Sequence, residues 1–374
     1  MRIALLSPFC SQNYGTVLQA FALAKVIESK GVQCEYIKWR RCEPSVFKRI
    51  LFLLRHPTYF FLHSQNVKLN NDGLKYSFLS QSEYQEVIKK NEKFVNAYTP
   101  FSSIEYTYDR LKCICNKYDR FIVGSDQTWN PSHIYQFSPY YLKFVKEESK
   151  KFSYGCSLGR TSLPENFVKY LGKTLSSFKM LSCREKENAE MLSKRTGKNV
   201  FHVLDPTLLL DKESWSPYMR PVNGMPKEYI LCYILGEKKI ITDYAEFLGK
   251  TTNLPVYYIL TRPCHANHSN VLKGMGVQEF LWLIDNCRYM VTDSFHGTIF
   301  SMNFGKNMVS FDKLEGDKFD NGRIKDVLSY YGIQNHYMKT YEERIPEDYC
   351  RNDILKLLQK KRKDSLDFLY RIIE

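Results

Sequence analysis

Residues 288–300 contain the side chain best suited to proton transfer in this chain. A short apolar run leads into Thr-Asp-Ser, and His296 then falls where a helix is expected to begin. The first turn of a helix leaves backbone N–H groups unpaired, so a phosphate or carboxylate can bind there beside a histidine that titrates near neutral pH. The segment therefore predicts an anion site next to a general acid or base. The alternative is that Asp293 or Ser294 only caps the helix and that His296 is a half-buried packing residue.

Two further polar loops follow expected strands. Residues 11–16 form a turn with a glycine at position 15, whose backbone donors could contact a phosphate or a sugar hydroxyl. Residues 123–131 combine the carboxylate of Asp126 with the indole of Trp129, a mixture typical of sugar recognition. The alternative for this second loop is an Asx-type turn with Trp129 buried.

A third loop, residues 182–185, leads from an expected strand into a helix. It places Arg184 where the guanidinium could bind a carboxylate or phosphate through two hydrogen bonds. The alternative is an ion pair between Arg184 and Glu185 on the helix surface.

The polar loops connect elements that alternate along the chain. Strands are expected at residues 2–6, 33–39, 120–123, 151–155, 179–182, 199–204, 229–235, 256–260, 288–291 and 307–311. Helices are expected at residues 15–29, 104–117, 184–195, 238–248, 277–286, 296–304 and 353–372. This alternation predicts an α/β fold with parallel sheets covered by helices on both faces.

A chain of 374 residues exceeds what one core usually serves, so we expect two doubly wound Rossmann-like domains that face a cleft. The first spans residues 1–212 with a helical excursion near 42–100, and the second spans 227–345. Residues 213–226, rich in proline, read as the linker, and residues 346–374 as a C-terminal helix. Ligands are expected at the carboxyl ends of the strands, in the cleft.

The net charge of +14 predicts an anionic partner: a phosphorylated ligand, an anionic membrane surface or nucleic acid. We expect no nucleic acid, because no recognition motif accompanies the charge. Eleven scattered cysteines without a CxxC pair favour reduced thiols and a cytoplasmic location, and no apolar run is long enough to span a membrane. Residues 264–268 hold one cysteine and two histidines, but they lack a second pair of ligands, so no metal is expected.

Residues 45–63 mix large apolar side chains with three basic ones, Lys48, Arg49 and Arg55. One interpretation is an interfacial helical hairpin on the inner face of the membrane, with its bases toward anionic headgroups. The alternative is an excursion packed on the first domain.

Several segments, in this order, resemble the polysaccharide pyruvyl transferase family over roughly residues 1–332. They are Asn13-Tyr14-Gly15, residues 124–130 (GSDQTWN), residues 182–185 (SCRE), residues 205–209 (DPTLL), residues 279–281 (EFL), residues 292–298 (TDSFHGT) and residues 321–324 (NGRI). The resemblance implies a GT-B-like pair of domains, with the acceptor on the first and the donor on the second. It also implies transfer of pyruvate from phosphoenolpyruvate to a sugar of a cell-surface or exopolysaccharide precursor, as a ketal, with release of phosphate.

On this resemblance His296 and Asp126 are the expected catalytic residues. The expected substrate-binding residues are Arg184, Ser294, Gly297, Thr298, Arg323, Asn13, Tyr14, Gly15, Ser125, Gln127, Trp129 and Asn130. Phosphoenolpyruvate is then a co-substrate, no cofactor is needed, and the sugar acceptor is either lipid-linked or free.

Two alternatives remain beside this hypothesis. A GT-B glycosyltransferase would bind a nucleotide sugar and need an acidic ribose contact, for which Glu315 and Asp317 are weak candidates. A non-catalytic scaffold of a cell-envelope assembly complex would not depend on His296.

Overall fold

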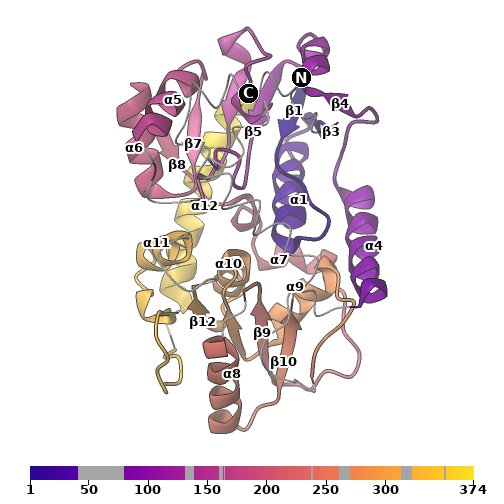
Figure 1. Cartoon of the computed structure of the whole chain (residues 1–374), viewed down its shortest axis with the longest axis vertical. Helices are drawn as coiled ribbons and strands as arrows, with labels where there is room; N and C mark the ends of the chain where they lie inside the picture. Colours follow the sequence, from indigo (N-terminus) through magenta and orange to yellow (C-terminus); the bar gives the residue numbers. More distant parts are fainter. Residues whose placement is uncertain are drawn as a thin grey trace.

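The computed structural model describes residues 1–40, 80–130, 139–159, 163, 165–236, 239–260, 270–312, 322–348 and 351–374. The basic segment 45–63, the Cys/His cluster 264–268 and the two acidic ribose candidates lie outside these described residues. Figure 1 shows two groups of strands and helices, one above the other, with the last helix running between them.

The N-terminal sheet is parallel, with strand order β2-β1-β5-β6. Its strands are β1 (Arg2–Leu6), β2 (Gln33–Tyr36), β5 (Arg120–Val123) and β6 (Lys151–Ser153). Single bridges from Phe152 to Met180 and from Cys156 to Cys183 extend it toward the parallel pair β7 (Leu181–Cys183) and β8 (Val200–His202). Helices α1 (Tyr14–Glu28), α5 (Glu165–Leu175) and α6 (Lys186–Thr196) belong to this group. Because β1 is buried almost throughout, its apolar run matches a strand covered on both faces.

The C-terminal sheet is also parallel, with strand order β10-β9-β11-β12-β13. Its strands are β9 (Ile230–Ile234), β10 (Val256–Leu260), β11 (Tyr289–Thr292), β12 (Asn307–Phe311) and β13 (Tyr337–Met338). The helices of this group are α8 (Lys239–Thr252), α9 (Val277–Asn286), α10 (Phe295–Asn303) and α11 (Gly322–Tyr330). In both sheets the first strand has a later strand on each side, which opens a crevice at its carboxyl end where ligands bind in such folds.

The prediction of a helix at residues 104–117 is wrong. This stretch forms the short strand β4 (Tyr106–Thr107), paired with β3 (Trp39–Arg40), and then the 3₁₀ helix η1 (Tyr108–Ile114). The buried residues of η1, Leu111 and Ile114, are three positions apart. Apolar residues three positions apart fit a 3₁₀ helix as well as an α-helix. The pairing of β4 with β3 decides between the two.

The two sheets share one continuous apolar core. Trp215, which lies in the expected linker at the end of α7 (Lys212–Trp215), is fully buried. Its ring centroid lies 5.4 Å from that of Phe21 on α1 and 5.3 Å from that of Phe300 on α10. Residues 213–226 therefore include packed structure that ties the two groups together. Helix α4 (Gln81–Tyr98) also contacts both groups, through α1 and α9.

The final helix, α12 (Arg351–Ile373), packs against both sheet groups. Toward the C-terminal group, Arg362 donates to the side-chain oxygen of Asn303 at 2.9 Å. Toward the N-terminal group, Ser365 accepts the backbone N–H of Leu204 at 3.0 Å, and the Phe368 ring lies 4.9 Å from that of Phe201. In the described part of the chain, no helix combines the length and apolarity needed to cross a membrane.

Candidate functional site

The carboxyl ends of strands from both sheets supply the charged groups of one site. From the N-terminal sheet, Asp126 follows β5, Arg184 and Glu185 follow β7, and Asp205 follows β8. From the C-terminal group, His296 lies in the first turn of α10 and Arg323 in the first turn of α11. Parallel strands bring their carboxyl ends to one edge, so residues far apart in sequence converge there.

The Arg184 guanidinium lies at the centre of this cluster, with its side chain only 1% exposed. Its Nη1 donates to Asp205 Oδ2 at 2.5 Å, its Nη2 to Asp126 Oδ1 at 3.0 Å, and its Nε lies 3.5 Å from Glu185 Oε1. Burial disfavours the charge, but the three carboxylates outweigh burial and raise the pKa of Arg184. Arg184 is thus surrounded by protein carboxylates, so a ligand anion would have to replace one of them before Arg184 could bind it.

Asp126 is held with a positive backbone φ of 68°, and its side chain is 15% exposed. Burial alone would raise its pKa, but the positive charges of Arg184 and Arg323 and a hydrogen bond from the Gln127 backbone outweigh burial and lower the pKa of Asp126. The carboxylate is therefore ionised at neutral pH and is a weak base. This favours orientation of a hydroxyl over its deprotonation.

His296 is partly enclosed, with a side chain 12% exposed, and its Nε2 lies 3.8 Å from Asp205 Oδ2. No described residue forms a hydrogen bond with this Nε2. Burial is the largest influence on the ring and lowers the pKa of His296, so the free protein holds it neutral. The ring also packs against Gly15, where an added Cβ would lie 2.1 Å from Nδ1. The site thus contains a neutral imidazole with one open nitrogen beside a carboxylate.

Arg323 is the second guanidinium of the site. Among the described residues it has no carboxylate within 4.0 Å, and its Nε has no hydrogen-bond partner. With its amide oxygen turned toward Arg323, Gln127 accepts from Nη1 at 3.2 Å and from Nη2 at 3.1 Å. Burial and the nearby Arg184 lower the pKa of Arg323. Because no described carboxylate lies within 4.0 Å of it, Arg323 is the better anion-binding candidate of the two arginines.

The ring of Phe295 lies within reach of both guanidiniums. The Arg184 Cζ lies 4.8 Å and the Arg323 Cζ 5.5 Å from the ring centroid. An aromatic face attracts each cation, so the ring helps to tolerate two positive groups close together.

The start of α10 is partly used by the protein itself. The Ser294 hydroxyl accepts the N–H of Gly297 at 3.2 Å, and the Ser294 carbonyl accepts the N–H of Thr298 at 2.9 Å. Ser294 therefore caps the helix, and among the described residues the N–H groups of Phe295 and His296 stay free for a ligand. Thr298 is buried and pairs with the Ser310 hydroxyl at 2.8 Å.

Other expected site residues pack inside the protein. Trp129 is fully buried and its Nε1 donates to the Tyr140 carbonyl at 3.2 Å, as the alternative of a buried indole requires. Tyr14 is also buried, and its hydroxyl donates to the Met275 carbonyl at 2.5 Å across the two groups. Ser125 is buried and donates to the Gly155 carbonyl at 2.7 Å. Neither aromatic ring is therefore placed to stack on a sugar.

Two expected residues differ in exposure: Asn130 is buried and Asn13 is exposed. Asn13 is exposed and caps α1, its side chain accepting the N–H of Gly15 at 2.9 Å. Asn130 lies beside Gln127. Both side chains face Gly159, where an added Cβ would come close to each of them.

Sequence reasoning gave no role to three residues that the fold brings to the site, Asp205, Phe295 and Asp326, and one of its alternatives placed the Arg184–Glu185 pair on the helix surface although both side chains are buried. Asp205 follows the expected strand at 199–204, so its position at a strand end was a usable signal. Asp326 lies one turn after Arg323 and, with it, lines a small cavity of about 30 Å³. Burial raises the pKa of Asp326 to about 6. Across the described ranges, no cluster of three or more metal-ligating side chains is found.

Comparisons with known proteins indicate the family and the fold of this chain. The family model described as polysaccharide pyruvyl transferase matches residues 13–312. A comparison with curated protein sequences gives no match.

Among solved structures, the UDP-GlcNAc 2-epimerase of Methanocaldococcus jannaschii is similar with a TM-score of 0.51 at 9% identity, over 96% of this chain and 92% of the other. UGT89C1 of Arabidopsis thaliana, complexed with UDP-L-rhamnose, is similar with a TM-score of 0.50 at 12% identity, over 99% and 98%. At these identities the likeness concerns the fold alone. It confirms the expected GT-B-like pairing of two Rossmann-like units with a C-terminal helix.

Proposed function

The chain belongs to the polysaccharide pyruvyl transferase family, and we propose that it transfers pyruvate from phosphoenolpyruvate to a sugar of a cell-surface or exopolysaccharide precursor. The product is a ketal, and phosphate is released. One observation carries the proposal: a neutral imidazole whose Nε2 has no hydrogen-bond partner lies beside a carboxylate, in the charged cluster that also includes Arg323, a guanidinium without a carboxylate partner among the described residues. The guanidinium can bind an anionic enol ester, and the imidazole can donate a proton to it.

Donor binding is the first step of the proposed mechanism. Arg323 and the free N–H groups at the start of α10 hold the carboxylate and phosphate of phosphoenolpyruvate. The anion then favours the charged form of His296, so its lowered pKa rises and the ring takes up a proton. Donor binding therefore protonates His296, the residue that then acts as the general acid.

Ketal formation follows with balanced protons. His296 gives its proton to the methylene carbon of the donor, which becomes a methyl group and leaves an oxocarbenium-like centre at the neighbouring carbon. One sugar hydroxyl adds to that centre, the bond to the phosphate oxygen breaks, and a second hydroxyl closes the ring. Of the two hydroxyl protons, one leaves with phosphate and one returns to His296.

Two carboxylates assist in different ways. Asp126, held ionised, orients the attacking hydroxyl by accepting its hydrogen bond. Asp205, which lies 3.8 Å from His296 Nε2 and bonds Arg184, stabilises the imidazolium after protonation.

His296→Gln tests this mechanism. We expect turnover to fall by about 10²–10⁴-fold, the usual contribution of general acid–base catalysis, while folding is retained. The assay is phosphate release from phosphoenolpyruvate with a panel of sugar acceptors, and circular dichroism checks the fold. A matched control is His336→Gln, which alters a buried histidine bonded to the Met308 carbonyl outside the site. Wild-type turnover by a folded His296→Gln variant would remove His296 from the mechanism.

The glycosyltransferase alternative rests on the fold that this chain has in common with UGT89C1. It predicts that nucleotide sugars, and not phosphoenolpyruvate, raise the melting temperature of the protein in thermal unfolding. We further propose a cytoplasmic location, since the eight cysteines in the described residues are all free thiols. Contact of residues 45–63 with an anionic membrane stays a prediction.

A further inference from the structure

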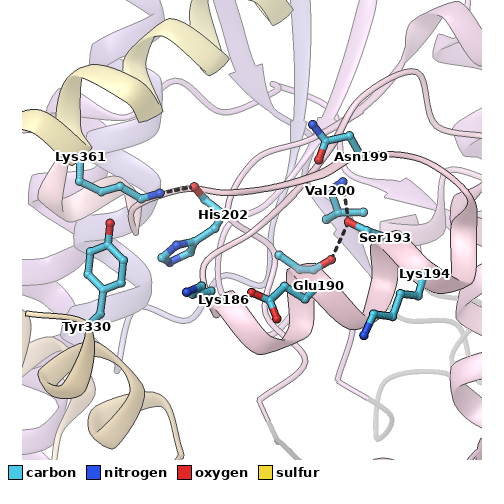
Figure 2. A pocket seen from close by; sticks show the side chains of 10 residues that line it. Lys186, Glu190, Ser193, Lys194, Asn199, Val200, His202, Tyr330 and Lys361 are labelled. Atoms are coloured by element: carbon cyan, nitrogen blue, oxygen red, sulfur yellow. Dashed lines mark hydrogen bonds between the residues drawn. The ribbon is translucent and has the colours of Figure 1, made fainter.

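A second concave site of about 670 Å³ opens between α6, β8 and the helices α11 and α12. Figure 2 shows Lys186 and Lys194 near the two ends of α6, with His202 next to Lys186 and with Tyr330 and Lys361 beyond His202. We call this site the lysine groove. The α6 residues that line it follow helical spacing, so one face of that helix forms a whole wall.

The lysine groove carries a surplus of positive charge. Three lysines line it against one carboxylate, that of Glu190. Within the described part of the chain, neither Lys186 nor Lys194 has a carboxylate within 4.0 Å. Burial and the nearby Lys361 lower the pKa of His202 to about 4, so this ring is neutral and adds hydrogen-bonding capacity without charge.

The lysine groove adjoins the small cavity lined by Arg323 and Asp326. His202 and Tyr330 line both the groove and the small cavity whose other walls include Arg184, Phe295 and Arg323. Lys361 donates to the His202 carbonyl at 2.7 Å, and the His202 ring bonds the backbone of Arg184. The side chains of His202 and Tyr330 therefore form a wall shared by the lysine groove and the cavity lined by Arg184 and Arg323.

We propose that the lysine groove binds a phosphate group carried by the acceptor sugar, so that the substrate class is a sugar phosphate. This inference rests on the proposed transferase function, because it is the acceptor that must approach His296 while the donor occupies Arg323. Lysine ammonium groups bind phosphate as mobile point charges, and the three that line the groove, two from α6 and one from α12, offset its charge. Tyr330 lies between the two cavities and offers a ring surface to the sugar.

The test measures binding of galactose 1-phosphate by calorimetry at low salt. We compare the wild type with Lys186→Gln/Lys194→Gln and with the charge-matched control Lys89→Gln/Lys93→Gln on the exposed face of α4. We expect the groove variant to bind about 10-fold more weakly and the control to bind like the wild type, since two exposed ion pairs are lost. Added salt should reduce the difference in affinity between the groove variant and the wild type, because salt screens exposed charges.

Equal affinity of the groove variant and the wild type would overturn the proposal, as would equally tight binding of uncharged galactose. A sugar linked through diphosphate to a short prenyl chain forms a second arm. Tighter binding of that compound than of galactose 1-phosphate identifies a lipid-linked source, and equal binding identifies a water-soluble one; either supports the groove. Phosphoenolpyruvate binding should be the same in the groove variant and the wild type, so a failure of the groove and a failure of the transferase proposal give different results.

Discussion

The two arginines of the site are expected to respond to substitution in opposite ways. Arg184→Met removes the cation that faces three carboxylates whose side chains are 1–15% exposed. Breaking a buried ion network in this way costs about 3–5 kcal/mol of the free energy of unfolding. Arg323→Met removes a cation that has no such partner among the residues that the structure describes, so its cost should stay within about 1 kcal/mol.

These free energies translate into melting temperatures. An unfolding entropy of about 2.1 cal/mol/K per residue gives roughly 0.8 kcal/mol/K for 374 residues. Arg184→Met should therefore melt about 4–6 °C below the wild type, and Arg323→Met within about 1 °C of it. Phosphoenolpyruvate at 100 times its dissociation constant stabilises by about 2.7 kcal/mol, which is a rise of roughly 3 °C in the wild type.

The assay is thermal unfolding with and without phosphoenolpyruvate, with the exposed Arg110→Met as a control for the loss of one charge. We expect Arg323→Met to lose most of the 3 °C rise and Arg110→Met to keep it. A full rise in Arg323→Met would refute the assignment of the anion to Arg323. An unchanged melting temperature in Arg184→Met would show that the three carboxylates do not depend on its charge.

Two further predictions concern His296. Because burial lowers its pKa in the free protein and a bound anion raises it, phosphoenolpyruvate binding should take up protons and strengthen as pH falls toward the free-protein pKa, by at most 10-fold per pH unit. Calorimetry in buffers of different ionisation enthalpy measures this uptake, and uptake that persists in His296→Gln would contradict it. Gly15→Ala should lower turnover by about 10²-fold while the fold is kept, because the new Cβ would lie 2.1 Å from Nδ1 and displace the ring, although alanine itself favours a helix. Phosphate release measures the effect, and wild-type turnover in that variant would show that the ring does not depend on this contact.

Much of the fold was predictable from the sequence because buried parallel strands are continuous apolar runs. The strands at 120–123, 256–260 and 307–311 and the helix at 277–286 have the predicted bounds. The helix predicted at residues 104–117 is not formed, because strand pairing, which is a long-range contact, decides the conformation of this stretch.

The chemistry of the site was less predictable than its location. Sequence patterns predicted that Asp126, Arg184 and His296 follow strand ends, and the structure places all three together. They could not predict that Arg184 is surrounded by carboxylates, because that depends on Asp205 arriving from another strand. For the same reason, the pattern of residues 123–131 could not distinguish an indole open to sugar from one buried under Tyr140.

The path of α12 has a consequence for the order of folding. Its last turns cover part of the N-terminal group, where Phe368 packs 4.9 Å from Phe201 and Arg120 donates to the Ile372 carbonyl. Those partners lie about 170 to 250 residues earlier in the chain, so during synthesis the N-terminal sheet emerges long before the helix that shields it. Until then Phe201 and its neighbours present an uncovered apolar surface, which chaperones recognise and which favours aggregation. The nascent chain is thus most vulnerable while the second sheet is being made.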